Sequence, residues 1–376
     1  MKKIFLDSAS TTYCDKEVVD SMLSCFSEYY GNPSSTHTFG REATKMVSDA
    51  RSIIAKSINA TSPNEIYFTS SGTEANNMAL FGIARANKGK GKHIISTKIE
   101  HQSVIDSLKR LEEEGFEITY LQTDKNGQVS IQEFKESIRN DTILISIMLC
   151  NNEVGTITNI KELAKISNEN GIIFHTDAVA GYCTIDIDVK DLNIDAMSLS
   201  SQKIYGPKGS GCLYIRNGIK FESLIYGGNQ EGGKRAGTLN VPSIVGFGKA
   251  VELYEKNKTK YRKRLNEIKT LFWEKLSNSK IVTKNGVNTV DTIISLTFKG
   301  ISNELIQTIL DMKGICCSLG SACTAGSTEP SHVLLGMGYS VKDAKSTIRF
   351  SFCKDLIDED IILATETILK TLEYLG

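Results

Sequence analysis

Short apolar segments alternate with amphipathic segments through much of the chain, and this alternation limits the possible folds more than any other feature. Short apolar runs bounded by turn residues are typical of buried strands, whereas apolar residues three and four positions apart are typical of helices. Strands are predicted at residues 65–69, 93–97, 116–121, 142–149 and 171–176. Helices are predicted at residues 40–57, 74–86, 101–114, 131–138 and 160–170. This series predicts an α/β fold with a mostly parallel sheet covered on both faces.

The pattern changes in the second half of the chain. After further strands, a glycine-rich stretch at 227–237 leads into a long helical pattern that ends near Leu276. The strands predicted in this half are at residues 194–199, 211–215, 223–226, 292–298, 315–318 and 347–351, and the last two helices at 302–312 and 358–375. The charged run 257–264 and the turn 284–286 favour a boundary between domains. We therefore predict a large domain at 15–260 and a smaller α+β domain made of 1–14 and 261–376.

Composition argues against several classes of binding partner and against secretion or insertion into a membrane. The 44 basic and 44 acidic residues balance, so no overall charge attracts nucleic acid or an anionic membrane. Nine cysteines, an odd number in a long chain, argue against a disulfide framework and for a reducing compartment. The first apolar run ends at Asp7, too early for a secretion signal, and no run is long enough to span a membrane. We expect a soluble cytoplasmic protein with no direct nucleic-acid or membrane partner.

Lys203 follows a run of polar residues at the end of an apolar strand. The strand predicted at 194–199 leads into Ser200 and Gln202, and Gly206-Pro207 stops any regular element after the lysine. In open α/β sheets this edge is where ligands bind. A lysine amine among hydroxyls can bond the aldehyde carbon of pyridoxal phosphate while the hydroxyls hold its phosphate. An exposed surface lysine is the alternative, and it is the commoner case for a lysine on its own.

Other polar groups are predicted at the same edge. Ser70-Ser-Gly-Thr-Glu74 opens a helix, where unpaired N–H groups and the dipole favour phosphate, although an ordinary helix cap has the same appearance. Asp177 directly follows a strand and can pair with a pyridinium nitrogen, or it can be a turn aspartate. His101 opens a helix. Its ring can stack on a flat cofactor, or it can be an ordinary polar residue at the start of a helix. Asn152 offers an amide at the end of another strand.

Cys323 and Arg349 are candidate residues in the smaller domain. Gly320-Ser-Ala-Cys-Thr-Ala-Gly326 surrounds Cys323 with small residues, so we expect a mobile thiol, whereas the other eight cysteines are expected to be largely buried. No metal site is predicted, because no Cys-x-x-Cys pair occurs and His332 is the only histidine nearby. Arg349, on a predicted strand, can bind a substrate carboxylate with its two-pronged guanidinium, or it can be a surface arginine.

Taken together, these motifs resemble the cysteine desulfurases of the NifS/IscS type, which are pyridoxal-phosphate enzymes of the class V aminotransferase superfamily. The resemblance spans nearly the whole chain, and several motifs in the right order are more specific than any one of them. The motifs are Phe5-Leu-Asp7, Gly31-Asn-Pro-Ser-Ser35, Phe68-Thr-Ser-Ser-Gly-Thr-Glu74, Glu100-His101, Asn151-Asn-Glu-Val-Gly155, Lys203-Ile-Tyr-Gly-Pro-Lys-Gly209, Gly237-Thr-Leu239, Gly320-Ser-Ala-Cys323 and Ile348-Arg-Phe-Ser351.

The resemblance implies the transferase fold of type I, with a large seven-stranded sheet, and a role for each candidate residue. Lys203 would bond pyridoxal phosphate and act as base, while His101 stacks on the ring and Asp177 binds the pyridine nitrogen. L-cysteine would be bound through its carboxylate by Asn152 and Arg349. The phosphate would be held by Gly72, Thr73, Ser200, Gln202 and, from the second subunit of a homodimer, Thr238. Cys323 would accept the sulfur as a persulfide and pass it to an acceptor protein, for iron–sulfur cluster assembly or tRNA thiolation.

Two positions depart from that family's pattern. Gln202 stands where a histidine is usual, and Ala180 stands where a glutamine usually donates to the cofactor's phenolic oxygen. The alanine side chain has no hydrogen-bond donor, so the sequence leaves open the rate of the reaction and the identity of its substrate. The alternatives are a pyridoxal-phosphate-dependent C–S lyase, a selenocysteine lyase, or a sulfur-relay or scaffold protein of low turnover.

Overall fold

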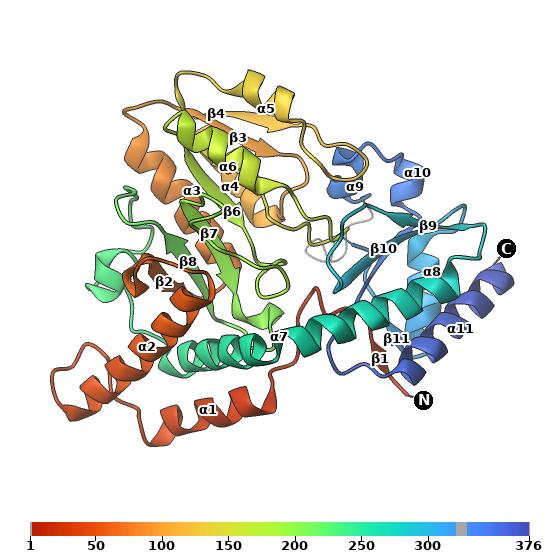
Figure 1. Cartoon of the computed structure of the whole chain (residues 1–376), viewed down its shortest axis with the longest axis horizontal. Helices are drawn as coiled ribbons and strands as arrows, with labels where there is room; N and C mark the ends of the chain where they lie inside the picture. The colour runs from red at the N-terminus through yellow and green to blue at the C-terminus, as the bar shows by residue number, and fades with distance from the viewer. Residues whose placement is uncertain (1, 321–328, 376) are drawn as a thin grey trace.

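A seven-stranded sheet forms the centre of the larger part of the molecule in a computed structural model that describes residues 2–320 and 329–375 (Figure 1). The strand order is β2-β8-β7-β6-β5-β3-β4. Neighbouring strands are parallel except at β8, which is antiparallel to β2 and β7, so the predicted mostly parallel sheet is confirmed. The bounds are β2 (Ile66–Thr69), β3 (His93–Thr97), β4 (Glu117–Leu121), β5 (Thr142–Ser146), β6 (Ile173–Asp177), β7 (Ala196–Ser200) and β8 (Gly211–Ile215).

Helices cover both faces of this sheet, because successive side chains of each buried strand point to opposite faces. On one face, α2, α6 and α7 pack in a core that includes Ile54, Leu163 and Phe247. On the other, α3 and α4 contribute Leu80 and Leu108 to a second core. The bounds are α1 (Lys16–Ser27), α2 (Thr38–Ser57), α3 (Gly72–Asn87), α4 (Gln102–Glu113), α5 (Ile131–Ser137), α6 (Ile160–Glu169) and α7 (Val241–Leu276).

His175 joins three adjacent strands inside the sheet. Its ring lies within 2.9 Å of the Ser146 hydroxyl on β5 and 3.0 Å of the Ser198 hydroxyl on β7. Burial lowers the pKa of His175 to about 3, so the imidazole is neutral at physiological pH. A neutral ring with one donor and one acceptor nitrogen satisfies both hydroxyls without burying a charge.

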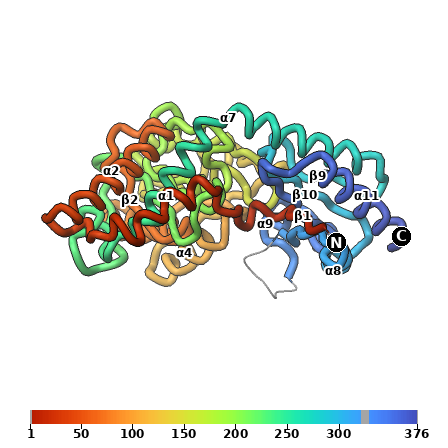
Figure 2. Tube along the Cα trace, turned by 90° about the horizontal axis from the view of Figure 1, so that it is seen from below, coloured from red at the N-terminus to blue at the C-terminus, as the bar shows by residue number. Residues whose placement is uncertain are grey.

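A smaller unit combines the two ends of the chain (Figure 2). Its antiparallel sheet has the order β12-β10-β9, and β1 pairs in parallel with β11. Leu6 packs in one core with Phe272, Phe350 and Ile368, which agrees with grouping the N-terminal segment with the C-terminal part; the division at 15 and 260 stays a prediction. The bounds are β1 (Ile4–Phe5), β9 (Val282–Asn285), β10 (Ile293–Phe298), β11 (Ile315–Cys316), β12 (Thr347–Ser351), α8 (Asn303–Met312), α9 (His332–Gly336), α10 (Val341–Ala344) and α11 (Asp358–Leu375).

The helix α7 connects the two units (Figure 1). It runs for 36 residues, with Phe247 and Tyr254 in the core of the larger unit and Leu265 and Phe272 in that of the smaller one. The charged run 257–264 lies in the middle of this helix rather than in a linker. One continuous helix therefore contributes to the cores of both units.

The strand predicted at 223–226 is wrong, because this segment is irregular. Its polar groups bond to the glycine-rich stretch that follows: the Ser223 hydroxyl donates to the Lys234 carbonyl, and the Ala236 N–H donates to the Ile225 carbonyl. β2 is an edge strand of the sheet, but its Phe68 N–H donates to the Glu231 carboxylate at 2.8 Å rather than to a further strand. Among the described helices, none has the length and apolar character that crossing a membrane requires.

Candidate active site

A cavity of about 310 Å³ opens at the carboxyl edge of the large sheet. The register places Thr69 opposite Gly211 and Gly211 opposite Ser200, while Asp177 lies opposite Ser198, so β2, β6 and β7 all end at this edge. The predicted site residues that line the cavity are Gly72, Thr73, His101, Asn152, Asp177, Ser200, Gln202, Lys203 and Arg349. Of the other two, Thr238 is exposed and does not line it, and Cys323 lies outside the described residues.

The start of α3 forms an anion-binding end of the cavity. Ser71 caps the helix by accepting a hydrogen bond from the Glu74 N–H at 3.1 Å. Gly72 is required by close packing, because a Cβ atom there would lie 2.7 Å from the Val179 Cγ2 atom. The unpaired N–H groups of the first helical turn and the Thr73 hydroxyl are suited to a phosphate.

Asp177 is a buried carboxylate at the end of β6. One oxygen accepts from the Asn76 amide at 2.7 Å, and the other accepts from the Val179 N–H at 2.9 Å. A carboxylate has about four acceptor sites, so it retains capacity for a further donor such as a ring N–H.

Asn76 and Ser103 connect Asp177 to His101. The Asn76 amide also donates to the Ser103 hydroxyl at 2.9 Å, and that hydroxyl lies 2.8 Å from His101 Nδ1. The Ser103 N–H donates to the same ring nitrogen at 3.1 Å. Because a backbone N–H can only donate, Nδ1 is an acceptor here, which leaves Nε2 as the ring nitrogen that carries a proton. Sequence reasoning missed Asn76, because its burial and its contact with Asp177 are visible only in the structure.

Lys203 ends a short 3₁₀ turn that follows β7, and its side chain reaches the cavity. The Lys203 ammonium donates to the carbonyls of Ala9 and Ser10, at 2.6 Å each. The Thr12 hydroxyl donates to the Gln202 carbonyl at 2.9 Å, which fixes this N-terminal segment against the turn. The segment thus forms a wall of the site and orients the amine.

Arg349, on β12 of the smaller unit, is 2% exposed and brings a positive charge to the opposite wall. Its guanidinium donates to the Asn152 carbonyl at 2.9 Å, to Asp7 at 2.8 Å and to the Ser10 hydroxyl at 2.7 Å. Within the described ranges, Arg349 Nε is a buried donor without a partner. This donor and the side-chain amide of Asn152, which also lines the cavity, suit a small carboxylate.

Glu153 contacts a residue on the C-terminal side of the segment that contains Cys323. The Ser331 hydroxyl donates to Glu153 at 2.5 Å. Gly320 and His332, which flank that segment, both line the cavity. The described chain on either side of Cys323 therefore borders the same site as Lys203.

Comparison with known proteins decides the family. The family model described as Aminotransferase class-V matches residues 4–363. The chain belongs to the class-V aminotransferases. The resemblance predicted from the motifs is confirmed.

Relatives of this class-V aminotransferase are described as cysteine desulfurases. It is 44% identical to the cysteine desulfurase IscS of Clostridium botulinum, over 99% of this chain and 95% of the relative. It is also 44% identical to the putative cysteine desulfurase IscS 1 of Bacillus subtilis, over 94% of each. A solved NifS-like protein matches with a TM-score of 0.93 at 33% identity, over 99% of this chain and 100% of that one. A structure described as SspA in complex with cysteine matches with a TM-score of 0.85 at 37% identity, over 95% and 100%.

The two departures both lie at the cavity of this class-V aminotransferase. Gln202 lines it, so its amide is available to an anion. Ala180 lines it too, and also borders an adjoining cavity of about 30 Å³ that Lys203 shares. A cavity of that volume has room for a water molecule. Water can therefore supply the donor that the alanine lacks.

Glu100, beside His101, is a buried carboxyl group that we expect to carry a proton at neutral pH. One oxygen accepts from the Thr97 hydroxyl at 2.7 Å and from the Met148 N–H at 3.1 Å, and the other has no partner among the described residues. Burial raises the pKa of Glu100 from 4.5 to about 8. The folded protein therefore keeps this proton at pH values where the unfolded chain loses it.

The replacement Glu100→Gln tests this protonation state. Below about pH 4.5 the Glu100 carboxyl is protonated in both the folded and the unfolded native sequence, so its contribution to the free energy of unfolding is at its most favourable. Between that pH and about 8 the free energy of unfolding falls by about 1.4 kcal/mol per pH unit through this group alone. Glutamine does not titrate, so Glu100→Gln lacks this fall. In urea denaturation from pH 5 to pH 8, the free energy of unfolding of Glu100→Gln minus that of the native protein should therefore rise with pH. The exposed Glu113→Gln is the control, and equal slopes for native protein and Glu100→Gln contradict the prediction.

Proposed function

We propose that the protein is a pyridoxal-phosphate-dependent cysteine desulfurase, which converts L-cysteine to L-alanine and transfers the sulfur to Cys323. The observation that carries the proposal is that one cavity is lined by an amine, a carboxylate, an anion-binding helix end and a guanidinium, contributed by Lys203, Asp177, α3 and Arg349. Support comes from relatives named cysteine desulfurases and from a structural neighbour described in complex with cysteine.

The residues of the cavity fit pyridoxal phosphate. Asp177 is buried and keeps acceptor capacity for a ring N–H, and the start of α3 suits the phosphate. Gly72 leaves room where a Cβ atom would collide with Val179. Thr73, Ser200 and Gln202 would hold the phosphate, and His101 would lie against the ring. When bound, the cofactor supplies an electron sink for the electrons of the substrate's Cα–H bond.

The chain's own residues would then bind cysteine, move its proton and accept its sulfur. Asn152 and Arg349 bind the substrate carboxylate, and the Lys203 amine takes the proton from Cα. The Cys323 thiolate attacks the substrate sulfur, so that the Cβ–S bond breaks and an S–S bond forms. In balance, cysteine and the Cys323 thiol give alanine and a persulfide, with no external oxidant or reductant. An acceptor protein for iron–sulfur assembly or tRNA thiolation would take the sulfur.

The test is the product formed from L-cysteine by the purified yellow protein. We expect alanine and, with a thiol reductant present, an equal amount of sulfide. Pyruvate and ammonia in place of alanine would indicate a C–S lyase. A rate that is appreciable only with selenocysteine would indicate a selenocysteine lyase, and persulfide exchange without alanine would indicate a relay protein.

We further propose a homodimer in the cytoplasm, with Thr238 completing the partner's phosphate site. Thr238 is exposed and does not line the cavity of its own chain. Helix α1 and the segment directly after it expose large apolar side chains, including Leu23, Phe26 and Tyr30, as expected of a surface covered by another chain. The eight described cysteines are free thiols, in keeping with a reducing compartment. The mass of the active protein in solution tests the dimer, and a fully active monomer contradicts it.

A further inference from the structure

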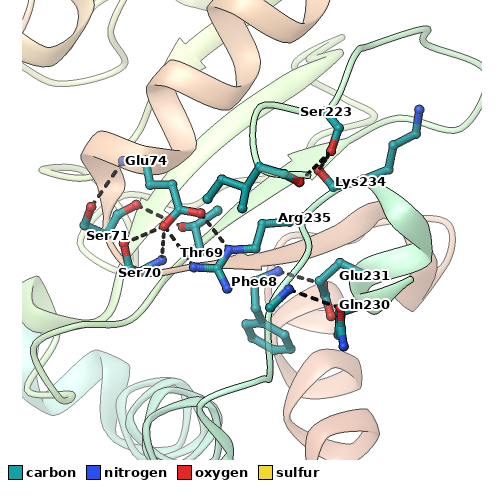
Figure 3. Close-up of polar contacts among 12 residues, drawn as sticks. Phe68, Thr69, Ser70, Ser71, Glu74, Ser223, Gln230, Glu231, Lys234 and Arg235 are labelled. Atoms are coloured by element: carbon teal, nitrogen blue, oxygen red, sulfur yellow. Dashed lines mark hydrogen bonds and ion pairs between the residues drawn. The ribbon is translucent and has the colours of Figure 1, made fainter. Parts of the chain in front are cut away.

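A partly buried ion pair lies at the start of α3, directly after the helix residues that line the cavity (Figure 3). Arg235 Nε donates to one carboxylate oxygen of Glu74 at 2.7 Å, and its Nη2 donates to the other at 3.2 Å. The Ser70 N–H and hydroxyl donate to the second oxygen at 2.8 and 2.5 Å. The side chains of Glu74 and Arg235 are 16% and 20% exposed, so water screens the pair only partly.

Both groups are charged at neutral pH. Burial by itself would raise the pKa of Glu74, but the hydrogen bonds from Arg235 and Ser70 outweigh it and lower the pKa. The same pairing with Glu74 raises the pKa of Arg235. The first turn of α3 therefore contains a permanent carboxylate charge directly after Thr73.

That charge conflicts with a phosphate. A glutamate in the first turn stabilises the helix through its dipole, but it also repels any second anion bound at the same end. Thr73 and Gly72, the two residues before it, line the cavity where the phosphate is proposed to bind. A matching positive charge is needed if the helix end is to attract a dianion.

Arg235 is placed to provide this charge by contacts that do not involve Glu74. Four residues before it, Glu231 accepts two hydrogen bonds from Arg51, at 2.8 and 2.5 Å. It also accepts one from the Phe68 N–H on β2 at 2.8 Å (Figure 3). The neighbouring Lys234 carbonyl accepts from the Ser223 hydroxyl at 2.8 Å. The backbone on the N-terminal side of Arg235 is thus fixed against the sheet, and its guanidinium is directed to Glu74.

We propose that Arg235 is a positioning residue for cofactor binding: it cancels the charge of Glu74 and so lets the start of α3 bind the phosphate of pyridoxal phosphate. The proposal rests on the proposed function. It differs from a purely mechanical role, in which the pair ties the glycine-rich stretch to α3 and either partner is equally necessary. In the electrostatic role the two partners have opposite effects, because an unpaired Glu74 repels phosphate whereas an unpaired Arg235 attracts it.

The experiment measures the dissociation constant of pyridoxal phosphate for the full-length protein, after removal and readdition of the cofactor, by absorbance. For Arg235→Gln we expect affinity to fall about tenfold, the size expected when one partly screened charge is left beside a bound anion. For Glu74→Gln we expect native or tighter affinity. The double variant should recover to within about threefold of native affinity, because the unbalanced charge is gone. Raising the salt concentration should reduce the defect of Arg235→Gln.

Arg85→Gln is a matched control, because Arg85 lies in the last turn of the same helix and forms a similar pair with Glu114, at 3.0 and 2.7 Å. It should leave cofactor affinity unchanged. Equal loss of affinity in Arg235→Gln and Glu74→Gln, with no recovery in the double variant, overturns the inference and leaves the proposed function intact. A native protein that binds no pyridoxal phosphate overturns both.

Discussion

The replacement Lys203→Ala is expected to abolish covalent attachment of pyridoxal phosphate and to lower the rate of alanine formation on the order of 10³-fold or more. The Lys203 side chain extends into the cavity from the turn after β7, where two backbone carbonyls orient its ammonium. It is both the amine that bonds the cofactor and the base that moves the Cα proton. Alanine removes both roles but preserves the turn, so the protein should fold normally.

Borohydride reduction followed by peptide mapping measures this attachment directly. The native protein should give a stable cofactor adduct at Lys203, and Lys203→Ala should give none. Lys208→Ala is the control, because Lys208 lies in the same loop but is exposed and does not line the cavity. An adduct at Lys208, or alanine formation at a native rate by Lys203→Ala, contradicts the assignment.

Much of the site could be predicted because it lies at strand ends. Asp177 and Ser200 end buried strands, and Lys203 follows within one turn, so an apolar pattern that locates the strands also locates these side chains at one edge. The same reasoning predicted the start of α3 to within two residues, since a helix that follows a strand begins at this edge.

The remaining parts depend on contacts between distant segments, which local patterns do not contain. Arg235 looks like one more basic residue beside a glycine-rich stretch until the fold brings it to Glu74, 161 positions earlier. Asn76 has the appearance of any helical asparagine until Asp177 is placed beside it. The strand predicted at 223–226 is wrong for the same reason, because its apolar character does not reveal that the Glu231 side chain bonds to the edge strand β2.

The charged run that favoured a domain boundary lies within a helix. Residues 257–264 are part of α7, where lysine and arginine are good helix formers. Arg262 and Lys258 in this run both pair with Asp186, outside the helix. The part of α7 between the two units is thus held by ion pairs to a loop of the larger unit.

The second large effect is expected for Cys323→Ser, which should lower alanine formation on the order of 10³-fold and abolish the persulfide. The reason is a separation of roles between residues. Binding of the cofactor and removal of the Cα proton depend on Lys203 and Asp177, whereas cleavage of the Cβ–S bond requires a thiolate that attacks sulfur. A serine hydroxyl is a far weaker nucleophile toward sulfur and is not ionised at neutral pH.

Cys323→Ser should therefore keep its yellow colour and still change its absorbance when L-cysteine is added, while mass spectrometry detects no added sulfur atom. Cys316→Ser is the control: burial and the nearby Asp311 raise the pKa of the Cys316 thiol, so it is a poor thiolate, and its loss should leave the rate of alanine formation unchanged. A persulfide on Cys316 in the Cys323→Ser protein would show that another thiol accepts the sulfur. Undiminished alanine formation by Cys323→Ser would show that the Cys323 thiol is not required for cleavage of the Cβ–S bond, and would contradict its assignment as the sulfur acceptor.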